Sequence, residues 1–185
     1  MSFIKLLFMQ ESFWFVMSAT FRGEIKMKQT LEELGFTCYV PLVYKVKKMR
    51  SGVYNRVVEP AISNLIFVYA SRNDIQIVKS RFPRLQYHTY QENGRNVPII
   101  VPNRQMESFI RATSIEENNL SYLSIDEIDL KKGTKVLVVG GPLDGVEGYF
   151  LKVKGAKSKK IVIHLQGISV AVAVEVSPDY VKVLD

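Results

Sequence analysis

Short apolar runs separated by turn-forming residues dominate the first half of the chain. In these runs hydrophobic and polar residues alternate, or apolar residues follow one another without a break, and both patterns are typical of strands. The runs predict strands over 13–17, 36–44, 64–70 and 97–101. Pro41 interrupts the second run, which indicates an edge strand or a bend because proline has no amide hydrogen for the ladder.

Helical spacing appears between these strands. Met27, Leu31 and Leu34 recur at i, i+4 and i+7, and Gly35 follows in the position where helices commonly end. A second segment places Ile75, Val78 and Phe82 on one face and basic residues on the other. Helices are therefore predicted over 23–34, over 72–81 and from 103 onward.

Two hairpins complete this half of the chain. One is a basic hairpin over 45–58 with its turn at Ser51-Gly52, and the other is centred on Asn93-Gly94. The resulting β-α-β-β-α-β order with a terminal helix is typical of an α+β sandwich of the ferredoxin-like kind. We expect this domain to span residues 13–112, after an N-terminal extension over 1–12.

The rest of the chain has a different pattern. Residues 113–128 are acidic and rich in Asn and Ser without clear periodicity, so they are predicted to be a linker between domains. Short strands then recur with glycine-containing or proline-containing turns between them. The expected strands are 134–139, 146–154, 160–165, 169–176 and 180–183. This spacing predicts a small SH3-like β-barrel over 129–185.

Composition and charge indicate the kind of partner. The chain has 185 residues, 47% hydrophobic and 23% charged, as ordinary globular proteins have. Its net charge is +7, which favours polyanionic partners such as nucleic acid. Residues 1–112 contain 16 Lys and Arg against 8 Asp and Glu, so most of the positive charge lies in the first predicted domain.

Candidate chemistry is sparse. Cys38 is the single cysteine, so no intramolecular disulfide forms, and the two histidines, His88 and His164, have no Cys or Glu at ligand spacing. No catalytic constellation stands out, and we therefore expect a non-enzymatic protein with no metal and no cofactor. The apolar start of the chain is too short to span a bilayer, which favours a cytoplasmic protein without a membrane partner.

A glycine-rich stretch over 133–151 is the most specific motif. Gly140, Gly141, Pro142 and Gly145 shape a tight loop between two predicted strands, because glycine adopts positive φ without penalty. A phosphate-binding loop is the competing interpretation, but such a loop must open a helix, and here a β-branched, aromatic run follows. The motif resembles the KOW motif of ribosomal proteins and of the NusG family of transcription factors.

The first predicted domain resembles the N-terminal (NGN) domain of the NusG family in three places. These are the strand containing Trp14, the helix that Gly23 and Glu24 open, and the Glu59-Pro60 segment before the strand over 64–70. The chain departs from the family pattern at Ser63 and Leu65, where proline and tyrosine are usual. The resemblance covers the chain from about Phe13 to Leu184 and implies an NGN domain followed by a KOW domain.

The resemblance also implies binding residues. In the family an apolar patch on the NGN sheet docks on the clamp region of RNA polymerase. The matching positions here are Phe15, Ile62, Leu65 and Phe67, and the alternative is that some of them fill the core. Basic residues are expected to contact the non-template strand, the upstream DNA duplex or nascent RNA through phosphates. These are Arg22, Lys26, Lys28, Lys45, Lys47, Lys48 and Arg50; a solvated basic face is the alternative.

The KOW domain of related proteins contacts a second partner, which is a ribosomal protein, the termination factor Rho or RNA. The matching positions are Leu143, Val146 and Ile168. Val146 replaces an aromatic residue of general NusG proteins, which leaves the identity of this partner open.

These features together favour a monomeric transcription elongation and antitermination factor that suppresses pausing and termination. The altered positions and the acidic linker resemble specialised paralogues, the UpxY-type antiterminators of capsular polysaccharide operons. The alternative is a KOW-containing ribosomal or translation-associated RNA-binding protein. We also expect the C-terminal domain to stay β-structured, with Phe15 and Phe67 open to polymerase.

Overall fold

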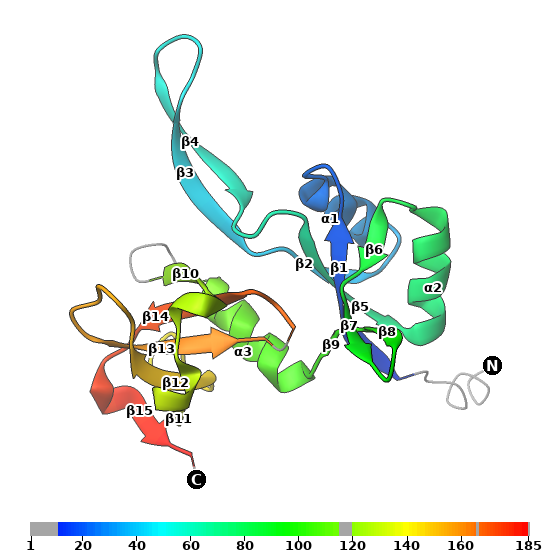
Figure 1. Cartoon of the computed structure of the whole chain (residues 1–185). Helices are drawn as coiled ribbons and strands as arrows, with labels where there is room; N and C mark the ends of the chain where they lie inside the picture. The colour runs from blue at the N-terminus through cyan, green and yellow to red at the C-terminus, as the bar shows by residue number, and fades with distance from the viewer. Residues whose placement is uncertain (1–10, 115–119, 166, 185) are drawn as a thin grey trace, which may run out of the picture. The chain divides into compact units, whose positions relative to one another are not determined.

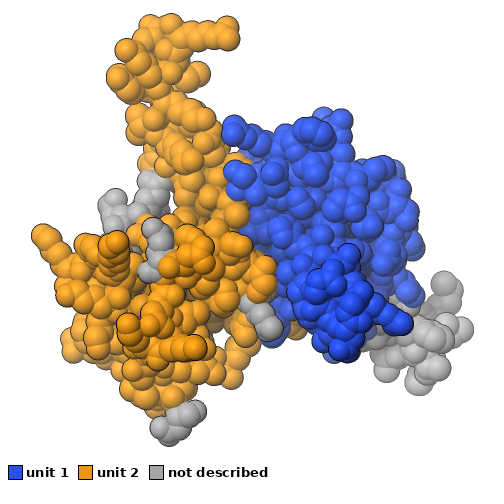
Figure 2. Space-filling view, in the orientation of Figure 1, with its two compact units in different colours: residues 1–40, 63–102 blue, residues 41–62, 103–185 orange. Residues whose placement is uncertain are grey.

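The computed structural model describes residues 11–114, 120–165 and 167–184. By its internal contacts the chain divides into two compact units, shown in different colours in Figure 2. Unit 1 comprises residues 1–40 and 63–102, and unit 2 comprises residues 41–62 and 103–185. Each unit is described by itself below.

Unit 1 is built on an antiparallel sheet with strand order β2-β5-β1-β6, and β9 also pairs with β1. Figure 1 shows this sheet with the helices α1 and α2 beside it. The order is that of a ferredoxin-like sandwich, as the sequence predicts. The elements are β1 (Ser12–Ala19), α1 (Glu24–Glu33), β2 (Thr37–Tyr39), β5 (Leu65–Ser71), α2 (Arg72–Arg81), β6 (Leu85–Tyr87) and β9 (Ile100–Val101).

The core of unit 1 lies between one face of this sheet and the two helices. Leu31 of α1 and Ile75 of α2 are fully buried in one cluster with alternate residues of β1 and β5. The α2 helix begins where the side chain of Ser71 accepts a hydrogen bond from the amide of Asp74 at 3.1 Å. Cys38 belongs to the same cluster, and burial raises the pKa of its thiol to about 12, so it is a packing residue rather than a nucleophile.

Both predicted hairpins are present. Strands β3 (Leu42–Lys48) and β4 (Tyr54–Pro60) pair only with each other among the described strands, and so do β7 (Thr89–Glu92) and β8 (Arg95–Pro98). The turn between β3 and β4 closes with a hydrogen bond from the Gly52 amide to the Met49 carbonyl, and Gly52 adopts φ +85°. We call the β3–β4 hairpin the ribbon (Figure 1).

Unit 2 contains a six-stranded antiparallel sheet with order β10-β14-β13-β12-β11-β15. All five strands predicted after residue 129 are confirmed, and no pairing between β10 and β15 closes the described strands into a barrel. The elements are α3 (Asn103–Thr113), β10 (Leu120–Ser124), β11 (Thr134–Val138), β12 (Glu147–Lys152), β13 (Lys159–His164), β14 (Val170–Glu175) and β15 (Val181–Val183).

The structure corrects the predicted linker over 113–128. Residues 115–119 lie outside the described residues, but Leu120–Ser124 form strand β10, which pairs with β14 along its whole length. Hydrogen bonds between main-chain groups of β10 and β14 hold this strand. Every residue type except proline can form both bonds, so the acidic composition that suggested a linker does not prevent the pairing. Of the predicted extension over 1–12, residues 1–10 likewise lie outside the described part.

Helix α3 packs within unit 2 on strands β12, β13 and β14. The Ser108 hydroxyl accepts a hydrogen bond from the Glu147 amide at 3.1 Å, and Arg104 pairs with the Glu147 carboxylate. The Arg111 guanidinium donates to the Asp144 carbonyl. The predicted first domain, 13–112, therefore contains residues of both compact units.

Candidate functional site

The pairing of β1 with β5 decides which residues share a face of the unit 1 sheet. Phe15 lies directly opposite Val68, and both belong to the buried cluster under α1 and α2. Residues directly opposite in an antiparallel pair point to the same side of the sheet. The prediction that Phe15 belongs to an exposed patch is wrong, because it faces the helices and fills the core.

Leu65 and Phe67 point to the other face of the sheet. Phe67 lies opposite Val16, and Trp14 lies opposite Tyr69 with ring centroids 5.2 Å apart. Leu65 and Phe67 are nevertheless fully buried, so the prediction that Phe67 stands open to a partner is also wrong for this structure. Ile62 is half-buried and belongs to unit 2.

A strained turn after β1 presents Arg22. Phe21 and Arg22 are consecutive non-glycine residues in the left-handed region, with φ of 64° and 54°. Such conformations persist only where the surroundings hold them and are concentrated at functional sites. The Arg22 amide donates to the Asn64 side-chain oxygen at 3.1 Å, and the Asn64 amide donates to Glu24 at 2.7 Å.

The carboxylate at the base of this turn is buried. Glu24 is 1% exposed, and among the described residues its second oxygen, Oε2, has no hydrogen-bond partner. The turn leaves the side chain of Arg22 exposed, and Lys26 is exposed on the following helix. Lys28 is half-buried and forms an ion pair with Glu32 at 2.6 Å. Of the three cations predicted on this turn and helix, Arg22 and Lys26 are therefore the exposed ones.

The remaining predicted cations lie on the ribbon. Lys45 and Lys47 both pair with Glu59 of the opposite strand, the former at 3.6 Å. The hydrogen bond from Lys47, together with the charges of both lysines, lowers the pKa of Glu59. Lys48 and Arg50 are exposed near the turn. The ribbon therefore brings the four cations together, with two of them partly neutralised.

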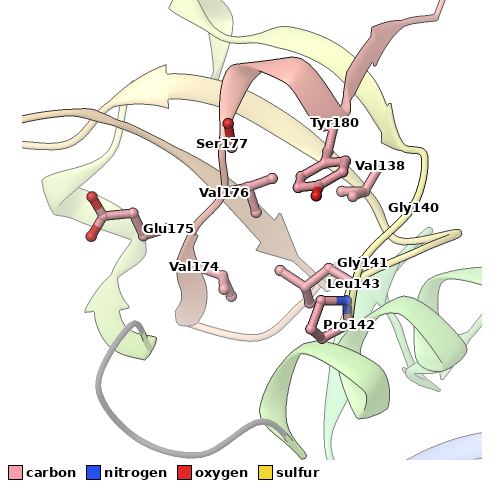
Figure 3. Close-up of a pocket in the computed structure, with 10 residues that line it drawn as sticks. All are labelled: Val138, Gly140, Gly141, Pro142, Leu143, Val174, Glu175, Val176, Ser177 and Tyr180. Carbon is pink, nitrogen blue, oxygen red and sulfur yellow. The ribbon is translucent and has the colours of Figure 1, made fainter.

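The glycine-rich loop of unit 2 forms one wall of a cavity of about 170 Å³, shown in Figure 3. Gly140, Gly141 and Gly145 have positive φ, which confirms the conformational reason for the motif. The Asp144 carboxylate accepts a hydrogen bond from the Gly140 amide at 2.6 Å and stabilises the loop. The Tyr180 ring lies close to Gly140 and Gly141, with Leu143, Val174 and Val176 completing an apolar lining.

The residues predicted to bind a KOW partner do not form an exposed surface. Leu143, Val146 and Ile168 are all buried, and only Leu143 lines the cavity. The prediction gave these residues a binding role because they lie in or near loops. In a small sheet domain, however, apolar residues of the loops also form part of the core. A partner of this region would first meet the loop backbone and Tyr180, which is exposed.

Within the described residues no group of three or more His, Cys, Asp or Glu side chains is arranged to hold a metal ion. None of the described helices has both the length and the apolar character needed to cross a membrane.

A family model described as "Transcription termination factor nusG" matches residues 12–110, which is more than half of the chain. The chain belongs to the NusG family. No curated protein matches it. Among solved structures, one described as "Domain interaction in Thermotoga maritima NusG" is 18% identical with a TM-score of 0.43, and the match covers 95% of this chain and 98% of that chain.

NusG-family proteins are transcription factors rather than enzymes, so family membership confirms the prediction of a non-enzymatic protein. The matched segment contains the NGN-like unit 1, the ribbon and most of α3. The alternative, a KOW-containing ribosomal protein, does not explain this segment of the chain.

Sequence reasoning missed two residues of this NusG-family ribbon, Tyr44 and Arg56. The Arg56 guanidinium lies 4.0 Å from the centre of the Tyr44 ring, across the two strands. The sequence contained a signal for this pair, because the predicted turn at Ser51-Gly52 fixes which residues of the hairpin share a face.

Proposed function

We propose that this chain is a transcription elongation and antitermination factor that binds RNA polymerase through its N-terminal region and suppresses pausing and termination. The observation that supports this proposal is the family match over residues 12–110. Polymerase binding is the property that the NusG family implies for that region. The cytoplasm is the compartment in which a bacterial factor of this kind would act.

The polymerase contact that we propose involves Ile62, Leu65 and Phe67. Leu65 and Phe67 lie on the sheet face that does not contact α1 and α2, and such a face suits docking by apolar burial. Both are buried in this structure, so binding through them requires them to become accessible first. Phe15 is removed from this set because it belongs to the core on the opposite face.

Suppression of pausing needs only a difference in affinity. A factor that binds the elongating form of polymerase more tightly than the paused form shifts the equilibrium towards elongation. A coupling free energy of about 1–3 kcal/mol changes the populations roughly 5- to 150-fold. No cofactor or covalent step is required of the protein.

We further propose that the chain is a specialised paralogue, acting on capsular polysaccharide operons as the UpxY-type antiterminators do. The support is the departure from the general family pattern at Ser63, Leu65 and Val146. Genome-wide occupancy would be restricted to one or a few loci for a specialised factor, and would follow polymerase over all genes for a general one.

Single-round transcription in vitro tests the proposed function. We expect the full chain to shorten pause lifetimes several-fold when it is added to elongating polymerase from the same organism. The control is the same template with a heat-unfolded sample of the chain. Unchanged pause lifetimes and unchanged termination at saturating protein would contradict the proposal.

A further inference from the structure

The two faces of the ribbon differ in chemistry. The register pairs Tyr44 with Val58, Val46 with Arg56 and Lys48 with Tyr54, so these six residues point to one side of the two-stranded sheet. All six are exposed. We call this side the cation–aromatic face.

The cation–aromatic face contains two layered pairs. The Arg56 guanidinium lies 4.0 Å from the centre of the Tyr44 ring, and the Lys48 ammonium lies 6.0 Å from the centre of the Tyr54 ring. Cations at these distances from an aromatic face are attracted to it, which orders both side chains before any ligand arrives. The outer side of a planar guanidinium ordered in this way is itself a stacking surface for a base.

The opposite side of the ribbon differs in charge and exposure. Lys45 and Lys47 are on this side, and Glu59 pairs with both of them. Val43 and Val57 on the same side are half-buried, whereas the apolar residues of the cation–aromatic face are exposed. The cation–aromatic face therefore has both the exposed apolar residues and the cations that lie over tyrosine rings.

A two-stranded sheet by itself is marginally stable in water, and this one exposes apolar residues on one side. Exposed apolar surface of this kind marks an interaction site. The partner must also tolerate a concentration of positive charge, because residues 41–62 contain five Lys and Arg against one Glu, a net charge of +4 out of +7 for the chain. A polyanion with flat apolar groups meets both requirements.

We propose that the cation–aromatic face binds single-stranded nucleic acid, with unpaired bases stacked on Tyr44, Arg56 and Tyr54. Proteins that bind single strands combine a basic surface with aromatic platforms, because every base has a stacking face. Duplex bases are already stacked and do not offer these faces. This inference rests on the proposed function and extends it by naming the side of the ribbon that receives a single strand and the residues on which its bases stack.

The two pairs are spaced for more than one base. Lys48, which lies opposite Tyr54, is four residues beyond Tyr44 along β3. At roughly 3.3 Å per residue, this places Tyr44 about 13 Å along the ribbon from the Lys48–Tyr54 pair, with Arg56 between them. A single flat base cannot cover both tyrosine rings, so we expect the two tyrosines to contribute to binding separately.

Anisotropy titrations of the full chain, without polymerase, test the proposal. Labelled single-stranded DNA, single-stranded RNA and duplex DNA of the same mixed sequence are compared. We expect either single strand to bind tighter than the duplex, and the two single-stranded arms to show whether DNA or RNA is preferred. Tyr44→Leu and Tyr54→Leu should each weaken single-strand binding about five-fold or more, with an unchanged dependence on salt.

Arg56→Lys separates stacking from charge. Lysine keeps the positive charge but lacks the planar group, so affinity should fall while the salt dependence stays the same. Tyr90→Leu is the matched control, because Tyr90 is 46% exposed on the other hairpin, against 51% for Tyr44, and should bind as the unsubstituted chain does.

The same variants are assayed for retention of RNA polymerase. Equal binding of single strands and duplex, or unchanged oligonucleotide binding by both tyrosine variants, would overturn the proposal. If those variants bind oligonucleotides normally but lose polymerase, the face is a protein-docking surface instead. Failure of the chain to retain polymerase at all would contradict the proposed function and leave the oligonucleotide result to be judged by itself.

Discussion

Replacing Phe15 by alanine is expected to lower the free energy of unfolding of unit 1 by about 3–5 kcal/mol, as large-to-small substitutions of buried aromatic residues do. The phenyl ring of Phe15 packs in the cluster between the sheet and α1 and α2, and its centroid lies 5.9 Å from that of Tyr87. Urea unfolding followed by the fluorescence of Trp14, the single tryptophan, measures this loss in the same strand.

Phe21→Ala is the matched control for this substitution. Phe21 is 84% exposed and the Arg84 guanidinium lies 5.4 Å from the centre of its ring, so the same change there should alter the free energy of unfolding by no more than about 1 kcal/mol. If Phe15→Ala costs less than about 1 kcal/mol yet abolishes polymerase binding, Phe15 is a surface contact after all, and the face assignment that we derive from strand pairing is wrong.

Charge reversal of Lys45, Lys47, Lys48 and Arg50 should weaken nucleic-acid binding by at least about 100-fold at low salt. The substitutions change the net charge of residues 41–62 from +4 to −4. The slope of log affinity against log salt should become less steep by about 0.7 for each phosphate of the single strand that the variant no longer neutralises. Anisotropy titrations over a series of salt concentrations measure both quantities.

Stability should change little in this variant, because water and salt screen exposed ion pairs such as those with Glu59. The matched control reverses four lysines in and beside the β12–β13 turn, which changes the total charge equally. These are Lys152, Lys154, Lys157 and Lys159, all exposed. Equal weakening by the control would mean that net charge, rather than the ribbon, determines binding.

Most elements of this fold were predictable because they depend on local sequence. The helices at Glu24–Glu33 and Arg72–Arg81 agree with the predicted spacing of apolar residues, and the ribbon turn lies where Ser51-Gly52 requires it. Strand β10 was not predictable in this way. Its strand character comes from pairing with β14, a contact between segments about 50 residues apart.

The candidate site was harder to predict than the fold. Alternation shows that successive residues of β1 point to opposite faces, but not which face the helices cover. That information lies in the pairing of Phe15 with Val68, and an error of one residue moves every side chain to the other face. The sequence places the four predicted cations on one hairpin, whereas their division between its two sides depends on the hairpin register.

Retention of RNA polymerase by the intact chain is the most direct test of the proposed function. The immobilised chain is exposed in parallel to purified RNA polymerase and to ribosomes from the same organism, and bound material is quantified for each. We predict saturable retention of polymerase and no comparable retention of ribosomes. Retention of ribosomes alone would contradict the proposal and favour a translation-associated RNA-binding protein.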